Sequence, residues 1–255
     1  MWKRKSLRIN SILTVCLITY NQNAFVTEAL DSIAAQKTTF DFDILIADDC
    51  SKDGTKQKIL EFTKKSSNTS LILQKKNIGA ANNHIDLIST PKTKYIACLE
   101  GDDYWTDPYK LQKQVDYLEA NPDCSICTHW VDEKVEDKNS IVVENESYNG
   151  FHRTDYFDKN SVFQKEEVIA FHSSSIVFRC CCVPLIANMP SSVATGDSWI
   201  TFACLTTGHG YCINENMSTY RVHSNSTWTP SSTYHRFLNS LHFLLRLSWS
   251  FPIQY

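Results

Sequence analysis

The sequence predicts an α/β fold, built on a mostly parallel sheet flanked by helices. From residue 12 to residue 130, apolar runs of strand length alternate with segments whose apolar residues repeat at helical spacing. A chain of 255 residues can bury one sizeable core, so we expect one domain with a small appendage. Acidic residues directly follow two of the apolar runs, which is where sheets of this class place their ligands.

The first half of the chain supplies most of the predicted strands. We place them at residues 12–19, 43–48, 70–74, 94–99 and 124–130. Between the first two strands, apolar residues repeat at helical spacing. A later helix is expected to begin at Asp107 and Pro108, an N-cap and first-turn pair, and to end before Asn121-Pro122.

The second half of the chain is less regular. Residues 132–160 are polar, charged and aperiodic, which predicts a variable loop or a hinge. After them we place a strand at 174–179, a helix at 197–207, a turn at Gly208-His209-Gly210, a short strand near 211–213 and a last helix near 232–249.

The two ends of the chain bear on membrane attachment. The run from Ile12 to Ile18 follows a basic start but lacks a cleavage pattern, so we interpret it as a buried strand and not as a signal peptide. No stretch approaches the roughly 20 apolar residues of a membrane-spanning helix. The last predicted helix has a broad apolar face, which fits either packing on the core or a helix lying in a membrane interface. We therefore expect a cytoplasmic protein, with peripheral attachment at the inner membrane face as the alternative.

Charge and cysteine content exclude several classes of protein. With 25 Lys and Arg against 28 Asp and Glu, the net charge is −3, so nucleic acid is not expected as the main partner. C-x-x-C occurs once, as Cys124 to Cys127, without the second pair of a zinc site. The adjacent Cys180-Cys181-Cys182 cannot easily bridge one another. We expect reduced core thiols, which are typical of cytoplasmic proteins.

Two groups of acidic residues follow predicted strands. Asp48 and Asp49 follow the second strand, where turn chemistry explains them as well as a binding site does. Glu100, Asp102 and Asp103 follow the fourth strand, and three carboxylates this close repel one another unless a cation lies among them. A hard divalent ion, Mn²⁺ or Mg²⁺, shared between carboxylates and a substrate phosphate, is favoured over a solvated turn.

Glycine-rich phosphate loops are missing from the sequence. The first strand is followed neither by G-x-G-x-x-G nor by a Walker motif, which disfavours dehydrogenases and P-loop enzymes. A nucleotide held by carboxylates and a metal ion fits the residues better.

Seven segments of the sequence occur in a familiar order. They are Leu17-Ile18-Thr19-Tyr20-Asn21, Ile46-Ala47-Asp48-Asp49-Cys50-Ser51-Lys52-Asp53-Gly54-Thr55, Asn77-Ile78-Gly79, Leu99-Glu100-Gly101-Asp102-Asp103-Tyr104-Trp105-Thr106-Asp107-Pro108, His172-Ser173-Ser174-Ser175, Gly196-Asp197 and Tyr220-Arg221-Val222-His223. In order and spacing they resemble the family 2 glycosyltransferases with the GT-A fold, over residues 10–228. The resemblance implies an inverting enzyme that moves a sugar from a nucleotide sugar, usually a UDP sugar, to an acceptor hydroxyl.

The resemblance also implies roles for individual residues. Asp197 matches the catalytic base, and Asp49 matches the acid that binds the nucleobase. The residues expected to bind the nucleotide sugar are Thr19, Tyr20, Asn21, Asp48, Asp49, Asn77, Asp102 and Asp103. Asp103, Asp102 and His223 are expected at the metal ion. The residues expected on the acceptor or donor-sugar side are Glu100, Trp105, His172, Ser173 and Arg221.

The implied mechanism follows from charge. A metal ion neutralises the charge that grows on the departing diphosphate, and one carboxylate takes the proton of the attacking hydroxyl on the opposite face. In-line attack then inverts the anomeric carbon.

The resemblance also implies a division of the chain. Residues 1–130 would form the nucleotide-sugar half of the domain, 131–228 the acceptor-binding and catalytic half, and 229–255 a helical tail.

The sequence departs from the family pattern at three places. Glu100 stands where many relatives have Asp, Gly196 stands where they often have Glu, and Ala81-Asn82-Asn83 stands where many have Ala-Arg-Asn. The departure at Ala81-Asn82-Asn83 leaves the nucleotide base open. Two other functions stay open: a sugar-nucleotide nucleotidyltransferase, disfavoured because no glycine- and lysine-rich loop follows the first strand, and a non-catalytic binding module. The resemblance implies a glycan acceptor, often lipid-linked in relatives, used in surface polysaccharide or glycolipid synthesis.

Overall fold

A computed structural model describes residues 10–136, 155–159, 171–188 and 196–224. The strands are β1 (Leu13–Thr19), β2 (Phe42–Asp48), β3 (Thr69–Leu73), β4 (Tyr95–Glu100), β5 (Tyr104–Trp105), β6 (Cys124–Val135), β7 (Tyr156–Phe157), β8 (Val177–Arg179) and β9 (His209–Val222). The helices are α1 (Val26–Ala34), α2 (Thr55–Lys65), α3 (Ala80–Ile88), α4 (Lys110–Ala120), α6 (Val183–Ile186) and α7 (Gly196–Leu205), with 3₁₀ turns η2 (Ser173–Ser175) and η3 (Cys180–Cys182). Within the described residues, nine strands form one sheet in the order β3-β2-β1-β4-β8-β6-β9-β5, and β7 pairs with β9.

The first half of the chain forms the parallel part of the sheet. Strands β3, β2, β1 and β4 run parallel to one another, joined by crossovers that contain α1, α2 and α3. The four predicted strands are confirmed to within one residue at each end. Because parallel strands end at the same edge of a sheet, the polar residues after β1, β2 and β4 come together there.

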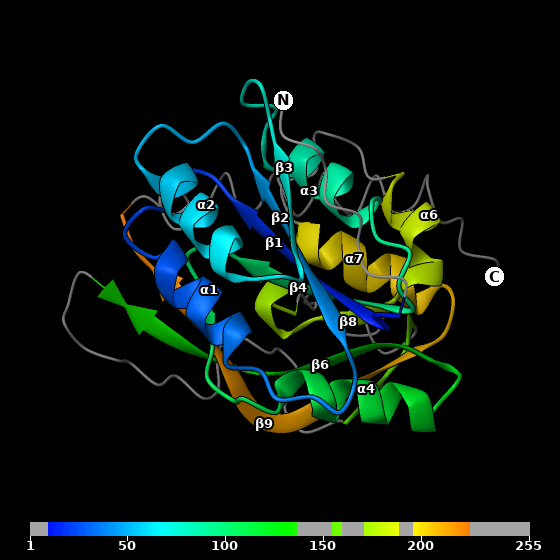
Figure 1. Cartoon of the computed structure of the whole chain (residues 1–255). Helices are drawn as coiled ribbons and strands as arrows, with labels where there is room; N and C mark the ends of the chain where they lie inside the picture. The colour runs from blue at the N-terminus through cyan, green and yellow to red at the C-terminus, as the bar shows by residue number, and fades with distance from the viewer. Residues whose placement is uncertain (1–9, 137–154, 160–170, 189–195, 225–255) are drawn as a thin grey trace.

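Helices cover both faces of this sheet. Residues of β1, β2 and β4 alternate between two buried apolar clusters, as the period of a strand requires. One cluster includes the apolar faces of α1 and α4, and the other includes those of α3 and α7. Figure 1 shows α1 and α2 on one side of the sheet and α3, α6 and α7 on the other. The predicted α/β architecture is therefore confirmed, with the sheet between two helical layers.

The second half of the sheet is mixed, and here several sequence predictions are wrong. β8 runs antiparallel to β4 and β6, whereas β6 and β9 are parallel. The predicted strand at 174–179 is split into η2 and the shorter β8, and β6 extends to Val135, five residues past the predicted end of the strand. The short strand expected near 211–213 lies near the start of β9, which has 14 residues. Register shifts in the pairing of β6 with β9 hide the regular alternation that sequence analysis depends on.

The predicted turn at Gly208-His209-Gly210 is also wrong, because His209 and Gly210 already belong to β9. A side chain at position 210 would collide with the ring of Phe157 in β7. At position 208, it would collide with the backbone carbonyl of Asp123. Both glycines are therefore required by close approach and not by a turn.

The helix expected to begin at Asp107 and Pro108 begins later. α4 starts at Lys110 and has Tyr109 at its N-cap position. The carboxylate of Asp107 instead accepts a hydrogen bond from the backbone N–H of Tyr109 at 2.7 Å, which makes a turn before the helix. The predicted end is confirmed, since α4 stops at Ala120.

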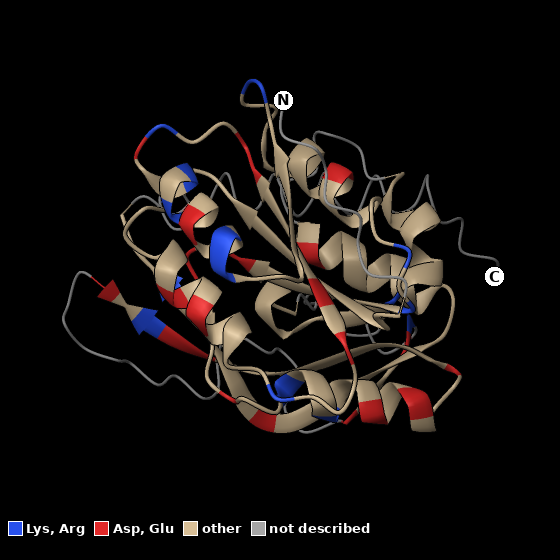
Figure 2. Ribbon diagram, viewed as in Figure 1, with Lys and Arg blue, Asp and Glu red and all other residues tan. Residues whose placement is uncertain are grey.

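Three further features concern the whole chain: its cysteines, its charged residues and its attachment to a membrane. All ten cysteines are free thiols, in agreement with the prediction that they do not form disulfides. Charged residues lie mainly on helices, connecting segments and strand ends (Figure 2). None of the helices that the structure describes is long and apolar enough to cross a membrane. The helix predicted near 232–249 and the tail 229–255 lie outside the described residues.

Candidate active site

The predicted site residues gather at the carboxyl ends of β1, β2 and β4. The parallel register sets Thr19 beside Asp48 and Ile18 beside Glu100, so the last residues of three strands are neighbours. η2 contacts β4 and β9, and β9 pairs with β5, so residues from the second half of the chain reach the same place. Segments that are far apart in the sequence therefore build one site.

The centre of the site is an acidic cluster of Glu100, Asp102 and Asp103. One carboxylate oxygen from each lies within 4.8 Å of the others. Asp103 is fully buried and Asp102 is 8% exposed. Among the described residues, Asp102 Oδ1 and Asp103 Oδ2 are buried and have no hydrogen-bond partner. Buried carboxylate oxygens that lack donors fit a cation that binds oxygen ligands.

The electrostatics of the cluster point the same way. Burial raises the pKa of Glu100 and the charges of Asp102 and Asp197 add to this effect, which brings the pKa to about 8. Burial also raises the pKa of Asp103 well above its usual value, with Asp102 and Glu100 adding to the effect. Like charges in a buried site disfavour ionisation, and a bound cation reverses that balance.

Arg221 forms hydrogen bonds with two acids of the cluster. Its backbone N–H donates to Asp103 Oδ1 at 2.9 Å, and its Nη1 donates to the carbonyl of Asp102 at 2.8 Å. Its Nε donates to Glu136 at 2.8 Å, and its Nη2 donates to Glu28. The side chain is 1% exposed, so these partners occupy it inside the protein. Arg221 was predicted on the sugar side, and its observed contacts are with the acids and their backbone.

Each aspartate of the cluster has a histidine beside it. His223 Nε2 lies 3.2 Å from Asp102 Oδ2, and His172 Nε2 lies 3.5 Å from Asp103 Oδ2. Burial lowers the pKa of His172 to about 4, so this imidazole is neutral at pH 7. His172 Nδ1 is also within 2.8 Å of Ser174 Oγ, which fixes the ring. The structure thus brings both predicted histidines to the acids.

Two further predicted residues, Ser173 and Trp105, contact the cluster or the turn η2 beside it. Ser173 Oγ donates to Glu100 Oε1 at 3.0 Å. Trp105 is 4% exposed, and its indole N–H donates to the carbonyl of Ser174 at 2.9 Å. Trp105 was predicted on the sugar side, but its buried ring faces the core.

Loops after β2 and β3 form the predicted nucleotide side. Asp48 Oδ2 accepts from the N–H of Ser51 at 3.1 Å, in agreement with its expected role in shaping the turn. The two oxygens of Asp49 accept from the N–H groups of Ile78 and Gly79 at 2.8 and 2.9 Å. Asp49 therefore joins the two loops, and each oxygen keeps a second lone pair.

Asn77 and Asn21 brace these loops. Asn77 Oδ1 accepts from the N–H of Gly79 at 3.0 Å. Asn21 has a positive φ of 52°, and its Oδ1 accepts from the N–H of Lys52 at 2.9 Å. Its own N–H donates to Ser51 Oγ at 2.9 Å. Tyr20, next to Asn21, is 46% exposed and is free to contact a ligand.

Several residues of the site were not predicted from the sequence. The side-chain oxygens of Thr19, which was predicted, and of Gln22, which was not, are buried without a partner in the described part of the chain. A side chain at position 101 would lie 2.9 Å from the first of these oxygens and 2.5 Å from the second, so Gly101 is needed for their approach. Glu28 and Glu136, the partners of Arg221, were also missed, because no local pattern connects residues 193 and 85 positions apart.

Asp197 lies in the first turn of α7. The helix begins at Gly196, one residue before the predicted start, so Asp197 is inside the helix and not at its N-cap. Asp197 Oδ1 accepts from the N–H of Ser198 at 2.7 Å. Burial raises the pKa of Asp197 to about 6. Its charge also contributes to the raised pKa of Glu100.

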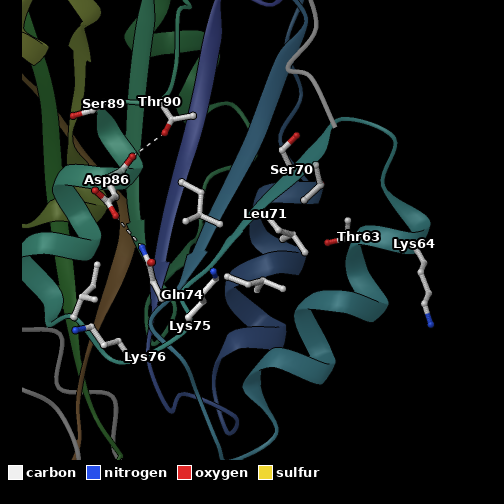
Figure 3. A pocket seen from close by; sticks show the side chains of 14 residues that line it. Thr63, Lys64, Ser70, Leu71, Gln74, Lys75, Lys76, Asp86, Ser89 and Thr90 are labelled. Carbon is white, nitrogen blue, oxygen red and sulfur yellow. Dashed lines mark hydrogen bonds between the residues drawn. The ribbon is translucent and has the colours of Figure 1, made fainter. Parts of the chain in front are cut away.

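A hollow of about 1240 Å³ lies along the outer edge of β3, away from the acidic cluster. Figure 3 shows Thr63 and Lys64 on one wall and Asp86, Ser89 and Thr90 on the other. None of the predicted site residues lines it. β3 is the edge strand, and lysines beside an edge strand commonly protect it from pairing with another chain. The hollow is therefore explained by the open edge.

Comparisons with known proteins identify the family of the chain. The family model described as glycosyl transferase family 2 matches residues 14–180, which include the acidic cluster. An uncharacterized protein of Mycobacterium tuberculosis is 32% identical over 226 residues, which cover 88% of this chain and 62% of that protein. The chain thus spans less than two thirds of the length of this relative.

Two further proteins are similar over different extents. The UDP-Glc:α-D-GlcNAc-diphosphoundecaprenol β-1,3-glucosyltransferase of Escherichia coli is 27% identical over 131 residues, 51% of this chain and 49% of that enzyme. The solved structure of a mannosyltransferase from Pyrobaculum calidifontis, in complex with GDP-Man and Mn²⁺, aligns with a TM-score of 0.65 at 16% identity. The alignment covers 96% of this chain and 66% of that one, and at this identity it shows a common fold.

Sequence, fold and the arrangement of acids at the carboxyl ends of the parallel strands now agree. The matched residues run from β1 to η3 and so contain the whole parallel half of the sheet. The chain belongs to glycosyl transferase family 2 and has the GT-A fold.

Proposed function

We propose that this protein is a metal-dependent, inverting glycosyltransferase that moves a sugar from a nucleotide sugar to an acceptor hydroxyl. The observation that carries the proposal is the acidic cluster, in which buried oxygens of Asp102 and Asp103 have no hydrogen-bond donor among the residues that the structure describes. Family membership and the carboxyl-edge position of the cluster support the same function.

Asp102, Asp103 and His223 would hold the metal ion. When bound, Mn²⁺ or Mg²⁺ supplies charge neutralisation for the diphosphate leaving group. The donor set fits such an ion, because each aspartate offers one buried oxygen without a hydrogen-bond partner in the described ranges, and His223 is beside Asp102. Arg221 keeps both acids in place through the backbone of Asp102 and the carboxylate of Asp103.

The remaining residues bind the donor and activate the acceptor. Asp49 would accept a hydrogen bond from the nucleobase with the lone pairs that its two backbone partners leave free. Thr19, Tyr20, Asn21, Asp48 and Asn77 would complete the nucleotide side. Glu100, His172 and Ser173 would lie toward the transferred sugar. Asp197 would take the proton of the acceptor hydroxyl, and attack opposite to the leaving group inverts the anomeric carbon.

Removal of divalent metal is expected to abolish sugar transfer. The clustered acids repel one another, and the diphosphate cannot leave readily without a compensating charge. The measurement is transfer, or donor hydrolysis, after exhaustive chelation and again after Mn²⁺ or Mg²⁺ is restored. Full activity in the chelated protein would contradict the metal assignment, whereas restoration by either ion would support it.

Activity is expected to rise with pH through the range near pH 6. A general base works when it is deprotonated, and burial raises the pKa of Asp197 to about 6. As pH falls below this value, Asp197 gains a proton and kcat should fall about tenfold per pH unit. The measurement is kcat from about pH 5 to about pH 8 with saturating metal. A rate that is constant over the acidic half of this range would argue against Asp197 as the base.

The donor and acceptor are proposed only as classes. The Escherichia coli relative is named for UDP-Glc and a diphosphoundecaprenol-linked acceptor, and the Pyrobaculum calidifontis enzyme was solved with GDP-Man. We propose a UDP sugar as donor, with a lipid-linked glycan at the inner membrane face as acceptor in surface polysaccharide or glycolipid synthesis. Hydrolysis of a panel of UDP and GDP sugars tests the donor, and NMR of the anomeric proton in the product tests inversion.

A non-catalytic binding module is the alternative to exclude. Such a module would bind a nucleotide sugar with metal but would neither hydrolyse nor transfer it. Binding by calorimetry combined with a missing metal-dependent turnover across the donor panel would favour the module over the enzyme.

A further inference from the structure

We propose that Trp105 and Gln114 are positioning residues for the acidic cluster, held in place by the buried Lys110. They act through η2, the turn that carries Ser173 and precedes β8. The inference rests on the proposed glycosyltransferase function, because its consequence is a slower reaction.

Two successive carbonyls of η2 are held from the core. The indole N–H of Trp105 donates to the carbonyl of Ser174 at 2.9 Å. Gln114 Nε2 donates to the carbonyl of Ser175 at 2.8 Å and to that of Cys127 in β6 at 2.7 Å. Both donating side chains are buried. Such bonds fix the position of a turn well, because no water can replace a lost partner there.

Lys110 sets the orientation of Gln114. Its Nζ donates to Gln114 Oε1 at 2.7 Å, which leaves both N–H groups of the amide for the two carbonyls. The same Nζ lies 4.4 Å from the centre of the Trp105 ring, a cation–π contact. One buried amine therefore contacts both side chains that hold η2.

A buried lysine lowers the stability of the protein, and the packing of a helix does not require one. Lys110 is fully buried on the core face of α4, and burial lowers its pKa to about 7. An apolar residue would fill the same volume without this penalty but would leave Gln114 Oε1 without a donor. The penalty is consistent with a role in fixing the geometry of η2.

The position of η2 sets the position of two side chains that contact the acidic cluster. Ser173 Oγ donates to Glu100 at 3.0 Å. Ser174 Oγ is 2.8 Å from His172 Nδ1, and the other nitrogen of that ring is 3.5 Å from Asp103. A displacement of the turn would therefore move a partner of Glu100 and a partner of Asp103 together.

The test combines Trp105→Phe with Ser173→Ala in a double-mutant cycle. Phe keeps an aromatic ring beside Lys110 but removes the N–H that Ser174 accepts, and Ala removes the bond to Glu100. Each single change is expected to lower kcat about tenfold while the donor KM stays within about twofold, because small displacements near reacting atoms cost rate more than binding. The double variant should be no slower than about the slower single variant, since both changes act through one turn.

A control variant removes a different hydrogen bond, which is partly buried. Tyr95→Phe in β4 deletes the hydroxyl that accepts from Arg179 Nη1 at 3.2 Å, away from η2. It should lower the melting temperature without changing kcat. If Trp105→Phe folds poorly, Gln114→Met replaces it, because it removes the bonds to Ser175 and Cys127 at similar side-chain length.

Amide hydrogen exchange gives a readout that does not need catalysis. The N–H groups of Ser175 and Ile176 donate to the carbonyls of His172 and Ser173 at 2.9 and 3.1 Å, so they report on the turn. Trp105→Phe should speed their exchange at least about tenfold, while Tyr95→Phe should not. Unchanged exchange, or kcat losses that multiply in the double variant, would overturn the inference. Inactive wild-type protein would instead refute the proposed function, and the exchange result would still decide on positioning.

Discussion

Asp103→Asn is expected to abolish sugar transfer while it raises the melting temperature of the metal-free protein. Asn has the same shape and can still accept the backbone N–H of Arg221 with its Oδ1. It offers no charge to a cation, and the loss of one metal ligand should lower kcat about 10³-fold, equivalent to several kcal/mol of transition-state stabilisation. Asp103→Ala should abolish turnover in the same way.

The opposite effect on stability follows from repulsion within the cluster. Asp103 is fully buried, and Asp102 and Glu100 add negative charge beside it. A neutral side chain relieves this repulsion when no metal is bound, a trade of stability for function that is common at active sites. The measurements are kcat with saturating Mn²⁺ and the melting temperature after chelation.

Asp132→Asn is the matched control for this experiment. Asp132 is another acid whose pKa is raised by burial, but it lies in β6 and bonds Asn216. Its replacement should leave kcat within about twofold of the wild type. Substantial transfer by a well-folded Asp103→Asn protein would exclude Asp103 as a metal ligand.

The parallel half of the fold was predictable because its signals are local. Each of the first four strands is an apolar run bounded by turn residues, and the helices between them repeat their apolar residues at helical spacing. β9 was predicted at about a fifth of its length, because its pairing with β6 is interrupted by register shifts and its residues alternate irregularly between buried and exposed. The structure of this mixed half of the sheet depends on contacts between strands that are distant in the sequence. Local sequence patterns do not contain such contacts.

The site divides in the same way. The acids of the centre were predicted because they are adjacent in sequence and follow a strand. The contacts that hold these acids in place were not predicted, because Arg221 contacts Glu28, and Gln114 contacts Ser175, only after folding. Trp105 shows why the direction of a side chain is hard to predict near a strand end. It follows the acids directly, yet in the two-residue strand β5 it is the buried residue.

Asp197→Asn is expected to lower kcat by about 10²–10⁴-fold, with folding and donor binding nearly unchanged, because Asn cannot accept the proton of the acceptor hydroxyl. Asn keeps the contact that Asp197 makes in the structure, since its side-chain oxygen can still accept the N–H of Ser198. Donor binding by calorimetry and the melting temperature provide the two controls. Asp197→Asn should also remove the dependence of the remaining rate on pH near 6, because the group with the raised pKa is gone.

Asp197→Ala separates this role from a structural one. If Asp197 only stabilises the start of α7, Asn should transfer sugar normally, and Ala should cost about 1 kcal/mol of stability through the lost helix-start bond. If Asp197 is the base, both variants lose kcat to the same extent, and only Ala also loses stability. Normal transfer by a well-folded Asp197→Asn protein would assign the residue to the helix start. The next candidates for the base would then be Glu166 and Glu167, which lie outside the described residues, and His172, which is neutral at pH 7 and lies beside Asp103.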